Sequence, residues 1–191
     1  MSSDQILEQF KEADALLDGH FILSSGLHSP QYLQCALALQ YPQDAAKYAR
    51  AIAERLAAES FDTVASPAIG GLVIGYETAR ALNTRFIWTE RQDGVMTLRR
   101  GFSVKKDERI LVVEDVITTG GSTRECIEAL DKKGAKTIAA VSIIDRSNGT
   151  ADVGVPRIAL ATLDVPVYKP EDCPMCHRGV EAVKPGSRVK N

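Results

Sequence analysis

The residues best suited to chemistry lie in one stretch, 110–124, whose sequence is ILVVEDVITTGGSTR. It begins with a short apolar run in which three of four residues are β-branched, a composition typical of a buried parallel strand. Two acidic residues, Glu114 and Asp115, follow where that strand is expected to end. A loop of hydroxyl-bearing and glycine residues comes next, and the apolar spacing beyond it predicts an amphipathic helix.

This order of elements predicts a site for a phosphate group beside a polar, uncharged group. Loop N–H groups and the N-terminus of the helix offer hydrogen-bond donors and the positive end of a dipole. The hydroxyls add donors, and glycine lets the backbone approach a ligand closely. The acids would repel a phosphate placed on them, so they suit sugar hydroxyls or a metal ion. Neither the G-x-x-x-x-G-K-[ST] loop nor the G-x-G-x-x-G loop of other nucleotide-binding folds occurs in the chain.

The composition of the whole chain narrows the classes of protein to consider. Its 191 residues are enough for one domain with a full core, and 45% hydrophobic with 25% charged residues is ordinary for a soluble globular protein. A net charge of −2 argues against a general nucleic-acid-binding surface. No apolar run approaches the ~18 residues of a membrane span, and the N-terminus lacks the features of a signal peptide. We therefore expect a cytoplasmic protein with reduced cysteines and with no membrane or nucleic-acid partner.

The order of hydrophobic patterns predicts an α/β fold. Helices are predicted over residues 4–17, 43–60, 72–82 and 122–133. Strands are predicted over residues 63–66, 85–89, 109–113, 138–144 and 158–163. Such alternation favours a doubly wound, mostly parallel sheet flanked by helices, which binds ligands at the carboxyl ends of its strands. Three candidate site loops lie there: 66–71, 114–122 and 145–149.

The stretch 110–124 resembles, without a break, the phosphoribosyl pyrophosphate (PRPP) motif of the type I phosphoribosyltransferases. The resemblance implies one domain over residues 1–191, with a core at approximately 43–165 and a small hood formed by approximately 1–40 and a C-terminal segment. It also implies that Glu114 and Asp115 grip the ribose hydroxyls of PRPP. The loop that would bind PRPP through its 5′-phosphate consists of Val116, Ile117, Thr118, Thr119, Gly120, Gly121 and Ser122.

A second glycine-containing loop, Pro67–Gly71, would bind pyrophosphate in this family. Gly70 and Gly71 would let the backbone approach the anion, with the N-terminus of the next helix directed at it. On its residues alone, a plain turn between strand and helix explains this loop equally well.

Two further segments resemble those of the orotate-specific branch of the family. Ser25 and Gly26 belong to an S-G-x-x-S-P segment of the hood, which would lie over the base, although Ser24 stands where many members have lysine. Arg146 belongs to a D-R-x-x-G segment, and its planar guanidinium would pair with the carboxylate of orotate. Thr118 would lie near the same base. Without the resemblance, both segments would be interpreted as solvated turns.

Residues 91–101 are predicted to form a polar loop, and residues 90–101 resemble the mobile catalytic loop of the family. In the family this loop closes over pyrophosphate in the neighbouring subunit, which implies a homodimer. Arg91 matches an arginine that reaches pyrophosphate, whereas the lysine and histidine of better-known bacterial loops are absent. Arg99 and Arg100 could supply the charge instead, but arginine is a poor proton donor at neutral pH. The alternative interpretation is an exposed polar loop whose arginines have no catalytic role.

The resemblance therefore implies an enzyme of pyrimidine synthesis that transfers the ribose 5-phosphate of PRPP to orotate, releasing pyrophosphate. Asp115 and the three loop arginines are its expected catalytic residues, and Mg²⁺ would be carried by PRPP rather than by dedicated protein ligands. One alternative is a phosphoribosyltransferase for a purine base. Another is a non-catalytic regulator of the same fold that senses PRPP and binds nucleic acid.

The C-terminal segment contains a C-x-x-C pattern, Cys173–Cys176, whose role is open. A zinc finger needs a second pair of ligands, and the other cysteines, Cys35 and Cys126, are far away in the sequence. Structural or incidental thiols are the favoured interpretation, with metal binding and redox chemistry as alternatives. His20 and His28 match no catalytic pattern, and we assign neither a catalytic role.

Overall fold

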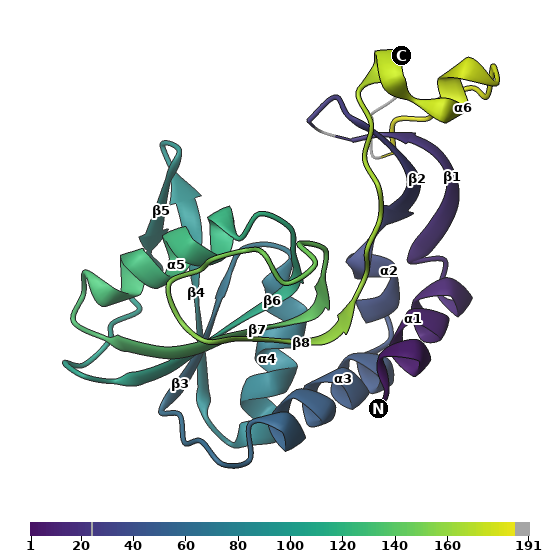
Figure 1. Ribbon diagram of the computed structural model, residues 1–191. Helices are drawn as coiled ribbons and strands as arrows, with labels where there is room; N and C mark the ends of the chain where they lie inside the picture. The colour runs from purple at the N-terminus through teal and green to yellow at the C-terminus, as the bar shows by residue number, and fades with distance from the viewer. Residues whose placement is uncertain (24, 186–191) are drawn as a thin grey trace.

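The computed structural model describes residues 1–23 and 25–185, and Ser24 lies outside the described residues. It confirms the α/β class: a mixed, mostly parallel sheet is flanked by helices (Figure 1). The helices are α1 (Ser3–Glu12), α2 (Cys35–Leu39), α3 (Pro42–Arg55), α4 (Gly71–Leu82), α5 (Gly121–Asp131), the 3₁₀ helix η1 (Pro170–Asp172) and α6 (Pro174–His177). No helix among the described residues has both the length and the apolar character needed to cross a membrane.

The strands form two sheets. They are β1 (Leu16–Ile22), β2 (His28–Leu33), β3 (Thr63–Pro67), β4 (Arg85–Gln92), β5 (Val95–Leu98), β6 (Arg109–Ile117), β7 (Lys136–Asp145) and β8 (Arg157–Thr162). The large sheet has the order β5-β4-β3-β6-β7-β8, and only the β4–β5 pair is antiparallel. The small sheet is the antiparallel β1–β2 hairpin. Every predicted strand is present, and the order places β6 at the centre of the large sheet.

Helices cover both faces of the large sheet because successive strand residues point to opposite sides. In β3, Val64 packs in one core cluster with Ile74 of α4, whereas Ala65 packs in the other with Ile127 of α5. Both β3 residues are fully buried. The central strands are therefore apolar on both faces, which explains why their sequences are continuous apolar runs.

The prediction of a helix over residues 4–17 is wrong at its C-terminal end. Helix α1 ends at the capping residue Ala13, Asp14 adopts a left-handed backbone conformation (φ 52°), and Leu16 already belongs to β1. The apolar residues there satisfied a helical spacing, but pairing of Leu16 with Leu33 of β2 selects the extended conformation. The stretch 19–41, which has no single pattern in the sequence, contains the end of β1, all of β2 and α2.

The prediction of a polar loop over residues 91–101 is also wrong in part. Strands β4 and β5 continue into this region as a hairpin, whose two turn residues, Asp93 and Gly94, both have positive φ. That conformation matches the tight turn for which Asp-Gly is a strong sequence signal. In Figure 1 this hairpin and the β1–β2 hairpin project from the same end of the molecule, on opposite sides.

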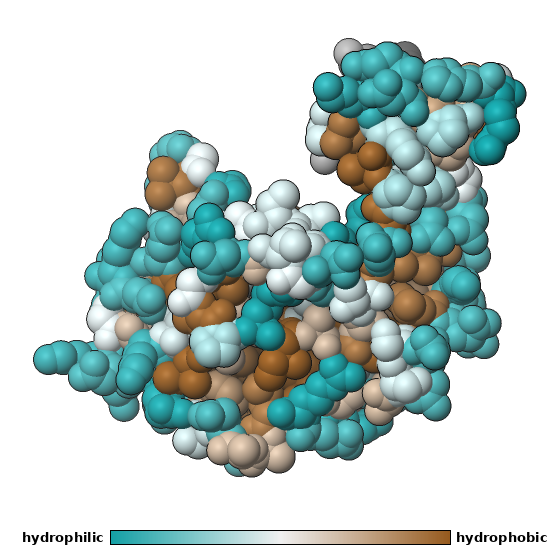
Figure 2. Space-filling view, in the orientation of Figure 1, coloured by the Kyte–Doolittle hydropathy of each residue, from teal (hydrophilic) through white to brown (hydrophobic). Residues whose placement is uncertain are grey.

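The C-terminal tail returns from β8 to the β1–β2 hairpin and packs against it (Figure 1). Phe21 pairs with Val183, and His28 pairs with Tyr168, each through an isolated β-bridge. Figure 2 shows a hollow between this hairpin–tail unit and the body of the molecule, with apolar side chains on the side of the unit that borders the hollow. The β1–β2 hairpin and the C-terminal tail thus build one projecting unit beside the carboxyl ends of the strands.

Candidate active site

The loop after β6 forms a cradle of backbone N–H groups at the start of α5. Strand β6 continues through Ile117, four residues beyond the predicted end, so Glu114 and Asp115 lie within the strand. Gly120 precedes the first residue of α5 with φ 77°, and a Cβ atom at this position would lie 2.8 Å from Val153 Cγ1. Only glycine meets both constraints without strain, so this turn holds the N-terminus of α5 open toward the loop.

This loop lines a cavity of about 270 Å³ at the carboxyl edge of the sheet. The cavity is walled by Pro67, Ala68, Gly70, Glu114, Asp115, Val116, Ile117, Thr118, Thr119, Gly120, Gly121, Ser122 and Thr123. Every residue predicted for the phosphate loop and the acid pair is in this set. A larger groove of about 500 Å³ between α1 and α3 is lined mostly by polar and charged side chains far from the strand ends.

The acid pair is held in an environment that favours the protonated form. Glu114 is only 6% exposed, and its burial, followed by the nearby charge of Asp115, raises the pKa of the Glu114 carboxyl to about 9. Burial also raises the pKa of Asp115, although this side chain accepts a hydrogen bond from the Val116 N–H at 2.8 Å. Two carboxyls this close share protons at neutral pH, so the pair offers both donors and acceptors to a polar ligand.

Gly70 and Gly71 lie close to the acid pair, at the end of the loop that joins β3 to α4. A Cβ atom on Gly70 would lie 2.8 Å from Asp115 Oδ1, and one on Gly71 would lie 3.1 Å from Glu114 Oε1. Gly70 lines the cavity, whereas Gly71 starts α4 behind it. The peptide bond between Ala68 and Ile69 is cis. The second predicted loop therefore shares one cavity wall with the acids, as a ligand spanning both loops requires.

Arg146 lies half-buried at the end of β7, adjacent to the cavity rather than in its wall. Its N–H donates a 2.8 Å hydrogen bond to the carbonyl of Ile117, which ties it to the end of β6. Within the described part of the chain, its guanidinium forms no hydrogen bond or ion pair. Burial lowers the pKa of this side chain, an effect that the nearby Cys35 opposes. A desolvated guanidinium without a carboxylate partner is suited to bind an anionic ligand.

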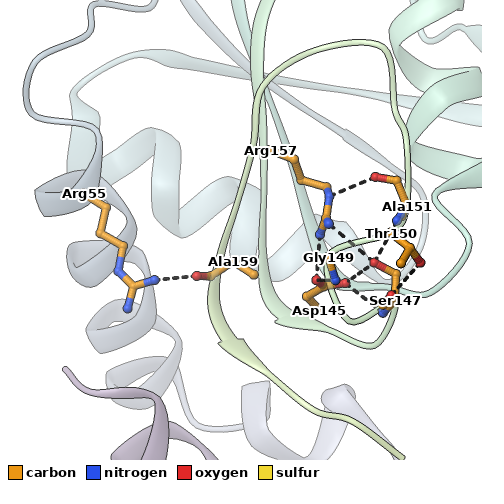
Figure 3. A network of polar contacts seen from close by, with 8 residues as sticks. All are labelled: Arg55, Asp145, Ser147, Gly149, Thr150, Ala151, Arg157 and Ala159. Atoms are coloured by element: carbon orange, nitrogen blue, oxygen red, sulfur yellow. Dashed lines mark hydrogen bonds and ion pairs between the residues drawn. The ribbon is translucent and has the colours of Figure 1, made fainter.

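A network of polar contacts fixes the loop that carries Arg146 (Figure 3). The buried Asp145 carboxylate lies 3.0 Å from Arg157 Nη1 and accepts hydrogen bonds from the Ser147 N–H and the Gly149 N–H, at 2.8 and 2.9 Å. Burial alone would raise the pKa of Asp145, but the hydrogen bonds from Ser147 and the ion pair with Arg157 lower it. Asp145 is therefore a structural anchor, and its neighbour Arg146 is left free to face a ligand.

The three arginines of residues 90–101 lie outside the cavity wall: Arg91 is in β4, and Arg99 and Arg100 directly follow β5. Arg91 forms an ion pair of 2.6 Å with Glu125 of α5. Arg99 and Arg100 lie 3.6 and 2.7 Å from Glu90, and all three arginines are exposed. The structure thus does not bring them together with the phosphate loop of the same chain.

Ser25 and Gly26 form the turn of the β1–β2 hairpin. Both are exposed, Gly26 has φ 83°, and neither lines the cavity.

Cys35, at the start of α2, is a residue near the cavity that was not predicted from the sequence. Its buried thiol lies near Asp115, and burial, followed by the charge of Asp115, raises the pKa of the thiol well above the usual value. No local signal could identify this contact, because the two residues belong to elements far apart in the sequence.

Comparison with known proteins agrees with this geometry. The family described as phosphoribosyl transferase domain matches residues 38–159, so the fold and the site define a phosphoribosyltransferase. Over 98% of its length the chain is 52% identical to an orotate phosphoribosyltransferase of Pelotomaculum thermopropionicum, covering 99% of that protein. It is 50% identical to the Thermotoga maritima protein of the same name, over 96% of this chain and 98% of that one.

A solved structure extends the agreement. The crystal structure of orotate phosphoribosyltransferase from Aeropyrum pernix superposes with a TM-score of 0.70 at 27% identity, covering 83% of this chain and 93% of that one. The chain belongs to the phosphoribosyltransferase family, in its orotate phosphoribosyltransferase branch. The family predicted from residues 110–124 is confirmed.

Proposed function

We propose that the chain transfers the ribose 5-phosphate group of PRPP to orotate, giving orotidine 5′-monophosphate and pyrophosphate in pyrimidine synthesis. The observation that carries this proposal is the free guanidinium of Arg146, desolvated beside a phosphate loop and an acid pair. In the reaction a ring nitrogen of orotate bonds to the anomeric carbon of the ribose, and the bond from that carbon to pyrophosphate breaks. Positive charge develops on the ribose, so positioning and charge stabilisation carry the catalysis.

The phosphate loop would anchor PRPP. Residues 118–122 supply hydroxyls and N–H groups, and the N-terminus of α5 supplies the positive end of its dipole. Val116 and Ile117 complete the cavity wall beneath the sugar. These contacts remain the same before and after the transfer, so they bind and orient the ribose without favouring either side of the reaction.

Glu114 and Asp115 would hold the two ribose hydroxyls. The proton that the pair retains at neutral pH lets one carboxyl donate while the other accepts, which matches hydroxyls that do both. An ionised Asp115 would also stabilise positive charge on the ribose in the transition state. The N–H groups of Gly70 and Gly71, beside the same acids, would bind the pyrophosphate end of PRPP.

Arg146 would bind the orotate carboxylate through its two parallel N–H donors. Thr118 would hydrogen-bond the base from the phosphate loop. Ser25 and Gly26 would close over the base when the β1–β2 hairpin moves toward the hollow seen in Figure 2. A neutral base such as hypoxanthine would leave Arg146 desolvated and unpaired, and this penalty disfavours the purine alternative.

Arg91, Arg99 and Arg100 would neutralise pyrophosphate in the partner subunit of a homodimer. Their present ion pairs with Glu125 and Glu90 are exposed, so each is worth little and is easily exchanged for a phosphate contact. One groove on the surface has a wholly apolar lining, and such a surface favours self-association of two chains. Its lining consists of Leu72, Val73, Tyr76, Phe86 and Trp88.

The donor set of the cavity fits Mg²⁺ delivered with PRPP. Glu114 and Asp115 retain a proton and would hold the ribose hydroxyls, so PRPP phosphates and water would supply most ligands of the ion, as is usual for Mg²⁺. Bound Mg²⁺ would reduce the negative charge of the leaving pyrophosphate. The four cysteines form no disulfide in the described part of the chain, which agrees with the proposed cytoplasmic location.

The substrate assignment is tested by following the ultraviolet absorbance of orotate with PRPP and Mg²⁺, with uracil, hypoxanthine and xanthine in parallel reactions. PRPP-dependent loss of orotate alone is the expected result. Turnover of a purine would refute the assignment. Binding of PRPP without turnover of any base would instead indicate a regulator.

The contribution of the hairpin to the partner's site is tested by mixing two impaired variants, Arg146→Ala and Arg91→Ala, at an orotate concentration far below the raised KM of the first. If the hairpin acts in trans, a mixed dimer contains one site with both arginines intact. Random reassortment should then restore about a quarter of wild-type activity, since half of the dimers are mixed and each has one complete site. If the hairpin acts within its own chain, mixing restores nothing.

A further inference from the structure

Four potential metal ligands converge in the hairpin–tail unit, away from the cavity. His20 lies in β1 and His28 in β2, whereas Cys173 and Cys176 flank the first turn of α6. One donor atom from each lies within 4.8 Å of the other three. His20, His28 and Cys173 are buried, and Cys176 is partly exposed. None of the four has a role in the proposed transfer reaction.

The separations match those around a single tetrahedral ion. Cys173 Sγ and Cys176 Sγ lie 3.5 and 3.7 Å from His20 Nε2, and Cys176 Sγ lies 3.3 Å from His28 Nδ1. With standard zinc bond lengths, tetrahedral geometry places sulfur and nitrogen ligands ~3.6 Å apart. The two histidine nitrogens, 2.7 Å apart, need only a small outward shift to reach the corresponding ~3.4 Å.

A backbone contact prepares His20 to be a ligand. Its Nδ1 lies 2.8 Å from the carbonyl oxygen of Val180, which only accepts hydrogen bonds. Nδ1 therefore carries the proton, and the lone pair of Nε2 faces the two sulfurs. A ring N–H held by a backbone carbonyl is the usual second contact of a metal-bound histidine, because it fixes the tautomer and the ring orientation.

We propose that His20, His28, Cys173 and Cys176 bind a structural zinc ion. Two cysteines and two histidines form a ligand set typical of structural zinc, and the C-x-x-C spacing supplies the cysteine half. Two thiolates balance the charge of Zn²⁺, so the burial of the cluster leaves no net charge in a dry environment. All four coordination positions are filled by the protein, so the ion has no open position for substrate and serves stability alone.

The location explains what such an ion would stabilise. Phe21 and Met175 are buried in the hairpin–tail unit but belong to neither of the two core clusters of the described residues. The unit therefore has little apolar core, the situation in which small structures use metals as staples. The hairpin and the tail each contribute two ligands, so the ion would join segments whose ligands His20 and Cys173 are 153 residues apart in sequence.

The test starts with the metal content of the purified full-length protein, measured by plasma mass spectrometry after growth with zinc. We expect about one zinc per chain in the wild type and at least a tenfold lower content in Cys173→Ser and His28→Asn. His177→Ala is the matched control, because His177 is next to Cys176 but is exposed and contacts the Glu171 carbonyl instead. It should keep the metal, as should Cys126→Ala, which removes a buried cysteine of α5.

Two further measurements distinguish zinc ligation from other uses of the thiols. Cobalt replacing zinc should give the visible spectrum of tetrahedral coordination with thiolate charge-transfer bands, and removal of the metal should lower the unfolding temperature. Wild-type protein without zinc and with a Cys173–Cys176 disulfide would overturn the proposal in favour of a redox pair. Zinc retained in both ligand variants would overturn it by locating the metal elsewhere. If those variants fail to fold, the wild-type metal content and cobalt spectrum still decide.

Discussion

Replacing Glu114 with glutamine should make the protein more stable and less active. The carboxyl of Glu114 is buried in the cavity wall, and its pKa is raised from 4.5 to about 9. The native state therefore holds a proton that the unfolded chain releases at neutral pH. As the pH rises from 4.5 towards 9, holding this proton destabilises the native state progressively. Glutamine has nearly the same shape and carries no charge, so the variant avoids this destabilisation.

The size of the effect follows from the shift. Each unit of pH between the unfolded and folded pKa values contributes ~1.4 kcal/mol, so at pH 7 the Glu114 carboxyl destabilises the native state by ~3 kcal/mol. At pH 5 the same calculation gives ~1 kcal/mol, because the unfolded carboxyl is then only partly ionised. The Glu114→Gln variant should exceed the wild type by these amounts, and the gap should widen with pH.

The assay is urea unfolding of both proteins at pH 5 and pH 7, with the free energy of unfolding extrapolated to water. Glu128→Gln is the matched control, because Glu128 is an exposed residue of α5 that lies 3.8 Å from Lys132, and we expect a change below ~0.5 kcal/mol at either pH. Activity should move the other way. Loss of the contact between the Glu114 carboxyl group and the ribose should lower kcat/KM roughly 10- to 100-fold.

A free-energy difference that is the same at both pH values would refute the reasoning, since a titrating group must change the difference. A variant that is less stable than the wild type at pH 7 would show that Glu114 is ionised in the native protein and stabilised by its contacts. If the Glu114→Gln variant is more stable but equally active, the raised pKa of Glu114 is supported and its role in binding the ribose is refuted.

Three further predictions address the surrounding loops. Arg146→Ala should raise the KM for orotate roughly 10- to 100-fold and leave the KM for PRPP nearly unchanged, and steady-state kinetics showing an equal rise in both would contradict orotate binding. Gly120→Ala should destabilise the protein by about 1–3 kcal/mol more than Gly154→Ala in thermal unfolding, because both positions have positive φ but only Gly120 lacks space for a Cβ atom. Asp145→Asn should cost about 3 kcal/mol, because the substitution leaves a buried ion-pair partner uncompensated. Because the pKa of Asp145 is lowered in the folded state, its contribution to stability is present above the unfolded pKa and is lost as the pH falls through the folded pKa. The free energy of unfolding of Asp145→Asn, measured during acid titration, should not show this loss.

The phosphate loop could be predicted from the sequence because its signals are local. The apolar run of β6, the glycine-containing turn and the amphipathic α5 follow one another within 109–131, so no distant contact was needed to identify them. The rule that parallel sheets bind ligands at carboxyl ends then located the other loops. The end of β6 was placed too early, because the polar pair Glu114 and Asp115 interrupts its apolar run, whereas the strand continues to pair with β7 through Ile117.

Features that depend on distant contacts could not be predicted. Leu16 fits a helix or a strand equally well by spacing, and its pairing with Leu33 decides the outcome. The sequence around Arg146 does not show that its neighbour Asp145 forms an ion pair with Arg157 rather than with Arg146. The β4–β5 hairpin is different, because Asp93 and Gly94 gave a local turn signal that the abundance of polar residues obscured.

The pairing of the C-terminal tail with the β1–β2 hairpin sets an order of events during synthesis. Ile22 donates a hydrogen bond to the Val183 carbonyl, and Val183 donates one to the His20 carbonyl, so these partners leave the ribosome about 160 residues apart. At about 5–20 residues per second, the hairpin waits roughly 8–30 s for its last strand partner. During that interval it presents unpaired backbone groups that could pair with another nascent chain. A stop codon, tag or proteolytic cut at the C-terminus therefore removes or disturbs the partner of the β1–β2 hairpin, which was synthesised near the start of the chain.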